Sequence, residues 1–153
     1  MPTLQDTIEI LSPPQTVWRV LSDPTFLPKL YNDAVTVEVD PPGHSSVGQT
    51  LKIQARVTGV RVAILAKYTR VDKESCLESK VVPGGLFSEF DHLVTLRVLG
   101  WGTEAKVTFQ YAVAAEYASK VPDLAMMERA ITDNFRTYAK NLKDLSELLP
   151  LPE

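Results

Sequence analysis

The sequence predicts an α+β fold in which a seven-stranded, curved antiparallel sheet is combined with two short helices and one long C-terminal helix. Residues 123–149 carry apolar side chains at helical spacing and contain no internal proline or glycine. In most of the range 35–113, apolar and polar side chains instead alternate, as they do in strands when one face of a sheet is buried. The two short helical stretches lie between a first strand and this alternating region.

The composition indicates one globular domain spanning residues 1–153. A chain that is 44% hydrophobic and 23% charged is typical of soluble proteins, and a net charge of −3 argues against binding of nucleic acid. No apolar run approaches the roughly 20 residues of a transmembrane segment. The first residues lack the features of a signal peptide, and Cys76 is the only cysteine, so we expect a cytoplasmic protein without an internal disulfide.

The N-terminal third predicts a strand and two short helices. Residues 3–10 alternate and predict the first strand. Ser12 is expected to cap a short helix, because the two prolines after it would occupy the first turn, where proline is tolerated. Asp23 and Pro24 end that helix, and residues 25–30 predict the second one.

Six further strands follow from the alternation and from the turns between them. The two residues 58–59 predict a tight hairpin that places Val57 opposite Val60 on the same face. Trp101, between two glycines, is expected to fold back over its hairpin. The side chains expected to face inward are Val35, Val37, Val39, Leu51, Ile53, Ala55, Val57, Val60, Val62, Ile64, Ala66, Tyr68, Leu77, Ser79, Val81, Ser88, Phe90, His92, Val94, Leu96, Val98, Ala105, Val107, Phe109, Tyr111 and Val113.

The long helix has an apolar stripe wide enough for a globular core. Asp123 is expected to cap it and Pro150 to end it. Asn134 and Asn141 lie at the margin of the stripe, where a packed core would use apolar residues, so we expect a wet or occupied space beneath them. The stripe consists of Leu124, Met127, Ile131, Phe135, Tyr138, Leu142, Leu145 and Leu149.

This order of elements, together with residues 12–24 (SPPQTVWRVLSDP), resembles the START-like, or SRPBCC, helix-grip superfamily. That group includes pollen-allergen-type ligand carriers, polyketide cyclases and dehydratases, aromatases, lipid-transfer domains and the accessory protein of carbon monoxide dehydrogenase. Residues 102–104 are similar to the family's Gly-Thr turn into its last strand. The resemblance covers the whole chain as one START-like domain and implies a container closed by the long helix.

A curved sheet covered by a helix is expected to leave a space that is packed, wetted or filled by a ligand. A dry void of about 300 Å³ would cost on the order of 7 kcal/mol, so we favour a cavity of 300–1,000 Å³ that binds a small hydrophobic ligand such as a lipid, an aromatic or a polyketide-like molecule. The candidate ligand-binding residues are the polar Tyr68, Ser79, His92, Tyr111, Asn134 and Tyr138 and the apolar Phe90, Phe109, Ile131 and Phe135.

The polar candidates have second interpretations. A lone histidine on an apolar face, such as His92, is more often a hydrogen-bonded group of the core than a base, and the three tyrosines are equally compatible with side chains that reach water at the edge of the sheet. A further hypothesis is a polyketide cyclase or aromatase that uses the same cavity, with a proton-transfer pair from Asp6 or His92 and a tyrosine.

Catalytic and metal-binding patterns are weak. The chain has two histidines and one cysteine without metal-ligand spacing, and no serine in a nucleophile turn, so we expect no catalytic constellation, no metal and no cofactor. A last hypothesis is an accessory module that docks on an unidentified protein partner or a membrane. It requires an exposed apolar patch, near Trp101 or residues 86–87.

Overall fold

The computed structural model describes residues 3–31, 36–57, 60–115 and 124–150. The expectations for Val35, for the turn at 58–59 and for Asp123 lie outside these ranges. The elements are β1 (Thr3–Ile10), α1 (Pro14–Ser22), α2 (Leu27–Leu30), β2 (Thr36–Asp40), β3 (Thr50–Val57), β4 (Val60–Asp72), β5 (Cys76–Val81), β6 (Phe87–Leu99), β7 (Gly102–Val113) and α4 (Leu124–Leu148).

The strands form one antiparallel sheet in the order β1-β7-β6-β5-β4-β3-β2. Six of them follow each other as hairpins, and β1 lies at the far edge beside β7. Val57 pairs with Val60, which confirms the predicted register of the β3–β4 hairpin. The predicted α+β class, with seven antiparallel strands, two short helices and a long C-terminal helix, is confirmed.

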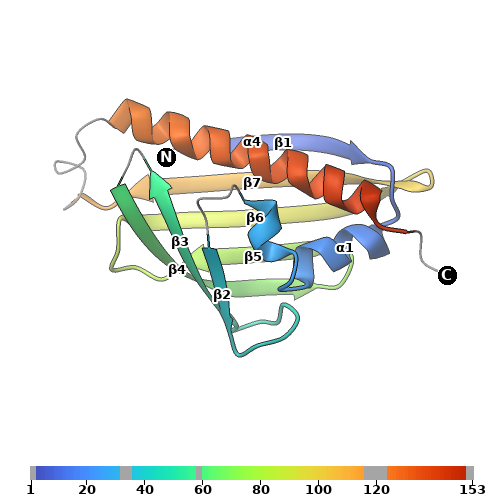
Figure 1. Ribbon diagram of the computed structural model, residues 1–153, viewed down its shortest axis with the longest axis horizontal. Coiled ribbons are helices and arrows are strands. Elements are labelled where there is room, and N and C mark those ends of the chain that lie inside the picture. The colour runs from blue at the N-terminus through green and yellow to red at the C-terminus, as the bar shows by residue number, and fades with distance from the viewer. Residues whose placement is uncertain (1–2, 32–35, 58–59, 116–123, 151–153) are drawn as a thin grey trace.

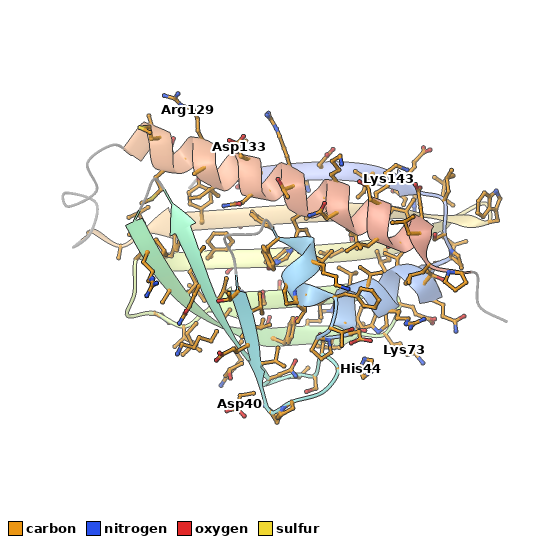
Figure 2. All side chains as sticks on the ribbon, in the orientation of Figure 1. Asp40, His44, Lys73, Arg129, Asp133 and Lys143 are labelled. Atoms are coloured by element: carbon orange, nitrogen blue, oxygen red, sulfur yellow. The ribbon has the colours of Figure 1, made fainter. Side chains whose placement is uncertain are left out.

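Helix α4 lies across one face of the sheet, and α1 and α2 lie beside its C-terminal half (Figure 1). The middle of its apolar stripe is buried, with Met127, Ile131 and Phe135 each about 5% exposed, and Leu145 and Leu149 are partly buried. Arg129 and Asp133 point away from the sheet into solvent (Figure 2). The helix therefore closes the face that receives the inward residues of the strands, and the core lies between the two layers.

Hydrogen bonds fasten the C-terminal half of α4 to the N-terminal elements. Asn141 Nδ2 donates to the carbonyl oxygens of Lys29 and Leu30, both at 3.2 Å, at the end of α2. Lys143 Nζ donates to the Glu9 carbonyl at 3.0 Å. Asn141 therefore satisfies two carbonyl groups that the short helix leaves unpaired.

Ser12 has a different role from the predicted one. The residue that precedes α1 is Pro13, and α1 has no side-chain cap. The Ser12 hydroxyl instead donates to the Ser146 carbonyl at 2.8 Å, and the Ser12 carbonyl accepts from Thr103 Oγ1 at 2.7 Å. The prediction of a cap was wrong because Ser12 is buried between α4 and β7, where a tertiary partner replaces the local one.

The alternation in β6 is interrupted by a bulge. Phe87 pairs with Val113 and Glu89 with Ala112, so Ser88 is an extra residue in the ladder. Consequently Phe87 is buried and Ser88 is exposed, contrary to the prediction for both.

The far end of the β6–β7 hairpin also differs from expectation. Val98 is 66% exposed and Trp101 is 67% exposed, because the hairpin extends beyond the region that the helices cover (Figure 1). Neither side chain faces the core, and the predicted folding back of Trp101 is wrong.

Candidate ligand-binding site

A cavity of about 80 Å³ lies between the concave face of the sheet and α4, and we call it the outer chamber. Its surface is predominantly apolar, and it is partly open to solvent. It is smaller than the expected 300 Å³, because aromatic side chains fill much of the space. Its lining consists of Tyr31, Ile53, Ala55, Val62, Ile64, Ala66, Ser79, Phe87, Phe90, His92, Phe109, Ile131 and Asn134.

A second cavity of about 20 Å³, the inner chamber, adjoins the first. The two chambers share Tyr31, Ile53, Ser79 and His92, which therefore form the partition between them. The remaining lining of the inner chamber is Leu27, Val37, Leu51, Tyr68, Leu77, Val94 and Tyr138. Its volume suffices for about one water-sized group.

His92 is held in the partition by its strand neighbours and by α4. On β6 it pairs with Ser79 of β5 and with Phe109 of β7. Its ring makes edge-to-face contacts with Phe109, at 4.7 Å between centroids, and with Tyr138, at 4.6 Å. The Nε2 atom is buried and has no hydrogen-bond partner among the residues that the structure describes.

Desolvation keeps the titratable groups of the chambers neutral. Burial lowers the pKa of His92 to about 4, so at neutral pH the imidazole offers one N–H and one lone pair. Burial also raises the pKa of the Tyr31 and Tyr138 phenols. The pKa of Tyr68 is raised by burial as well, against a smaller opposing effect of a hydrogen bond with Ser45.

Three phenylalanine rings line one wall of the site, and a fourth on α4 packs against them. Phe87 and Phe90 meet edge to face with centroids 5.0 Å apart, and Phe90 meets Phe109 at 5.4 Å. Phe109 continues the series to Phe135 on α4, at 5.0 Å. Such edge-to-face pairs stabilise the wall beyond the burial of their surface, and they connect the sheet with the helix.

The structure brings most of the predicted site residues together. Ser79, Phe90, His92, Phe109, Ile131 and Asn134 line the outer chamber, and Tyr68 and Tyr138 line the inner one. Tyr111 and Phe135 lie outside both linings. Tyr111 stacks on Phe90 at 5.9 Å and Phe135 packs against Phe109, so they support the wall from behind.

Several lining residues were not among the predicted site residues. Ile53, Ala55, Val62, Ile64 and Ala66 belong to the predicted inward face, so the alternation of β3 and β4 could have identified them.

Phe87 and Tyr31 lie outside this alternation, which therefore did not predict them as lining residues. The bulge at Ser88 turns Phe87 inward, and Tyr31 reaches the partition from the end of α2. Phe87 is therefore a wall residue rather than part of an exposed patch.

A metal site, a catalytic role for Asp6 and a membrane-spanning helix find little support in the part of the chain that the structure describes. There, no three His, Cys, Asp or Glu side chains gather as a metal site would require. Asp6 is exposed on β1 and lines neither chamber, so it is not placed to form a proton-transfer pair with a tyrosine of the site. Within the same ranges, no helix has the length and hydropathy to span a membrane.

Fold and site together define a helix-grip container with an apolar core cavity. The chain belongs to the family described as polyketide cyclase / dehydrase and lipid transport, whose model matches residues 1–147. A search of curated proteins found no match.

Solved structures share the fold at low sequence identity. The Zhui aromatase/cyclase from Streptomyces sp. R1128 superposes with a TM-score of 0.79 at 17% identity, over 95% of this chain and 93% of that one. A START superfamily protein from Mycobacterium smegmatis gives 0.74 at 16% identity, over 97% and 99% of the two chains. The protein TTHA0849 from Thermus thermophilus gives 0.73 at 20% identity, over 95% and 97%.

Proposed function

We propose that the protein binds a small hydrophobic ligand in the outer chamber. The observation that carries this proposal is the apolar, aromatic-walled cavity between α4 and the sheet. Leaving about 80 Å³ of such space empty costs on the order of 2 kcal/mol, at about 24 cal/mol per Å³. A ligand that fills it recovers this free energy and gains from the burial of its own apolar surface.

The size of the chambers favours a ligand of about one ring over a long acyl chain. An apolar cavity of about 150 Å³ accommodates benzene, whereas the chambers measure about 80 and 20 Å³. A one-ring molecule therefore needs only a small outward shift of a wall side chain, or projects in part through the open side. Indole, a compact molecule of two fused rings, is still expected to bind more tightly than palmitate.

The five isoleucines of the chain provide a direct test. Ile53, Ile64 and Ile131 line the outer chamber, whereas Ile8 and Ile10 lie on β1 and line neither chamber. In a protein labelled at the isoleucine δ1 methyl groups, indole is expected to shift the first three NMR signals and leave the other two in place. Equal shifts at all five methyl groups, or none at any of them, would contradict the proposal.

A pair of matched substitutions on β4 separates the cavity from the surface. Ala66 lines the outer chamber, and Ala63 is exposed on the opposite face of the same strand. Ala66→Leu fills part of the chamber and is expected to weaken indole binding at least tenfold. Ala63→Leu adds the same atoms outside and is expected to change the dissociation constant less than twofold, as measured by calorimetry.

A second candidate function is a cyclase or aromatase reaction in the same cavity. The contact between His92 and Tyr138 favours it, because it places two proton-carrying groups beside one space. The likeness to a structure described as an aromatase/cyclase also supports it. His92 would take a proton from a carbon between two carbonyls, and the enolate would attack another carbonyl of the same chain. This attack would close the ring, the proton would return to the new alkoxide, and loss of the hydroxyl with a neighbouring proton as water would then introduce a double bond.

The pH dependence of the rate tests this candidate. With a synthetic poly-β-ketone thioester as substrate, kcat/KM followed by absorbance is expected to fall as the pH drops toward 4, where His92 becomes protonated. His92→Ala is expected to abolish this fall of kcat/KM at acidic pH and to lower the rate about 100-fold or more. If the protein binds the thioester but accelerates no cyclisation, the binding function stands alone.

A further inference from the structure

The partition between the chambers contains a polar atom that the protein leaves unsatisfied. His92 Nε2 is buried and has no hydrogen-bond partner in the described ranges of the chain. Such atoms are rare in folded proteins, since burial removes the water that would otherwise bond them. Because His92 borders both chambers, a molecule in either one lies beside its ring.

The inner chamber has the size and lining of a site for one hydroxyl group. Its volume of about 20 Å³ holds one water-sized group. Five of its eleven lining residues carry a hydroxyl or imidazole group, namely Tyr31, Tyr68, Ser79, His92 and Tyr138. The outer chamber is predominantly apolar. A molecule that spans the partition therefore meets a larger share of polar side chains at its inner end, five of eleven, than in the outer chamber, where they are four of thirteen.

The chambers contain nothing that would neutralise a charge. Among the described residues that line them, none is an Asp, Glu, Lys or Arg. The phenols keep their protons and the imidazole stays uncharged at neutral pH, because burial disfavours each ionised form. A carboxylate or an ammonium group would lose its hydration there without gaining a counter-charge, which disfavours its entry.

We propose that the inner chamber is a hydroxyl-binding subsite, and that the ligand is an uncharged, one-ring molecule whose single hydroxyl group bonds to His92 Nε2. This inference rests on the proposed function, since the ring must occupy the outer chamber. A hydroxyl group both donates and accepts, so it satisfies the imidazole in either neutral tautomer.

A pair of nearly isosteric probes tests the subsite. p-Cresol and p-xylene differ by a hydroxyl in place of a methyl group, and 4-methylbenzoate adds a negative charge. We expect p-cresol to bind at least as tightly as p-xylene, although p-cresol loses more hydration on binding. We expect 4-methylbenzoate at pH 8 to bind at least tenfold more weakly than p-cresol.

Two substitutions show whether His92 causes the preference. His92→Phe removes the hydrogen-bonding groups and keeps an aromatic ring, and it is expected to reduce the affinity ratio of p-cresol to p-xylene at least tenfold. His92→Gln keeps a donor and an acceptor and is expected to retain most of that ratio. Using the ratio cancels any general effect of the substitution on the shape of the cavity.

The wild-type protein provides a readout that does not depend on a folded variant. The chain has two histidines, and His44 is exposed on the loop between β2 and β3 (Figure 2). With ¹⁵N-labelled imidazoles, p-cresol is expected to shift the His92 Nε2 resonance while p-xylene does not, and His44 serves as the internal reference.

The outcomes separate the subsite from the binding function. If both probes shift the methyl groups of Ile53, Ile64 and Ile131 but leave the His92 nitrogens unchanged, the hydroxyl subsite is overturned and ligand binding stands. An unchanged affinity ratio in His92→Phe, or equal binding of 4-methylbenzoate, overturns it as well. If neither probe shifts those methyl groups, the proposed function fails, and the subsite with it.

Discussion

At His92, a polar ring is held among aromatic side chains without the hydrogen bond that its Nε2 atom would make in water. The contribution of this buried ring to the free energy of unfolding depends on whether the imidazole is protonated. Burial lowers the pKa of His92 from 6.5 to about 4, which means that the folded protein resists protonation more strongly than the unfolded chain does. The other titratable groups that line the chambers are Tyr31, Tyr68 and Tyr138, and they keep their protons throughout the acidic range.

This shift predicts a specific loss of stability in acid. Between pH 6.5 and about 4 the unfolded chain binds a proton at His92 that the folded protein does not, so the free energy of unfolding falls as the pH decreases. A lowering of this size corresponds to roughly 3 kcal/mol. Relative to His92→Phe, the wild-type protein is expected to lose about that much between pH 7 and pH 4 in urea titrations.

The comparison with the variant removes the contribution of the carboxyl groups, which both proteins share. Parallel stability curves for the wild type and His92→Phe would show that the imidazole is not desolvated. His44→Gln removes the only other histidine. If this variant keeps the pH dependence of the free energy of unfolding, that dependence belongs to His92.

At the scale of the element, α4 is divided into two functional parts. Ile131, Asn134 and Tyr138 lie over the chambers, whereas the tethers to α2 and β1 begin at Asn141. Lys143 also pairs with Glu147 at 2.6 Å, and Glu147 accepts from the backbone N–H of Leu11. The tethers thus position the helix, and the preceding turns form the roof of the site.

The tether at Asn141 is expected to be measurable in the stability of the protein. Asn141→Ala removes both hydrogen bonds to the carbonyl groups at the end of α2, which is expected to lower the free energy of unfolding by about 1–2 kcal/mol. Lys140→Ala, which breaks only an exposed ion pair with Asp144, serves as the control and is expected to change it by less than about 0.5 kcal/mol. Urea midpoints that shift equally in the two variants would contradict a special role for Asn141.

At the scale of the whole molecule, the curved sheet and α4 form a container whose interior is largely occupied by its own aromatic side chains. The series of four phenylalanine rings spans from the β5–β6 turn to α4 and reduces the space to two small chambers. The family match and the structural neighbours agree with the container fold. The size of the chambers, rather than the fold, sets the class of ligand that we propose.

The sequence by itself determined the architecture, because periodicity depends on local geometry. Alternation along β3 and β4 predicted which side chains face inward, and the two-residue turn between Val57 and Val60 fixed their register. The helical spacing of residues 124–149 predicted a single helix with one buried face. Most of the candidate site followed from these two periods, since His92, Ser79 and Ile131 occupy inward positions.

Only the tertiary structure decided what those inward positions do. Ser12 bonds to α4 instead of capping its own helix, and the bulge at Ser88 brings Phe87 to the cavity. The volume of the chambers and the unpaired Nε2 of His92 depend on how side chains from distant strands and helices meet. Such packing is a property of contacts between segments far apart in the chain, and a periodic pattern contains no information about the gaps that remain between them.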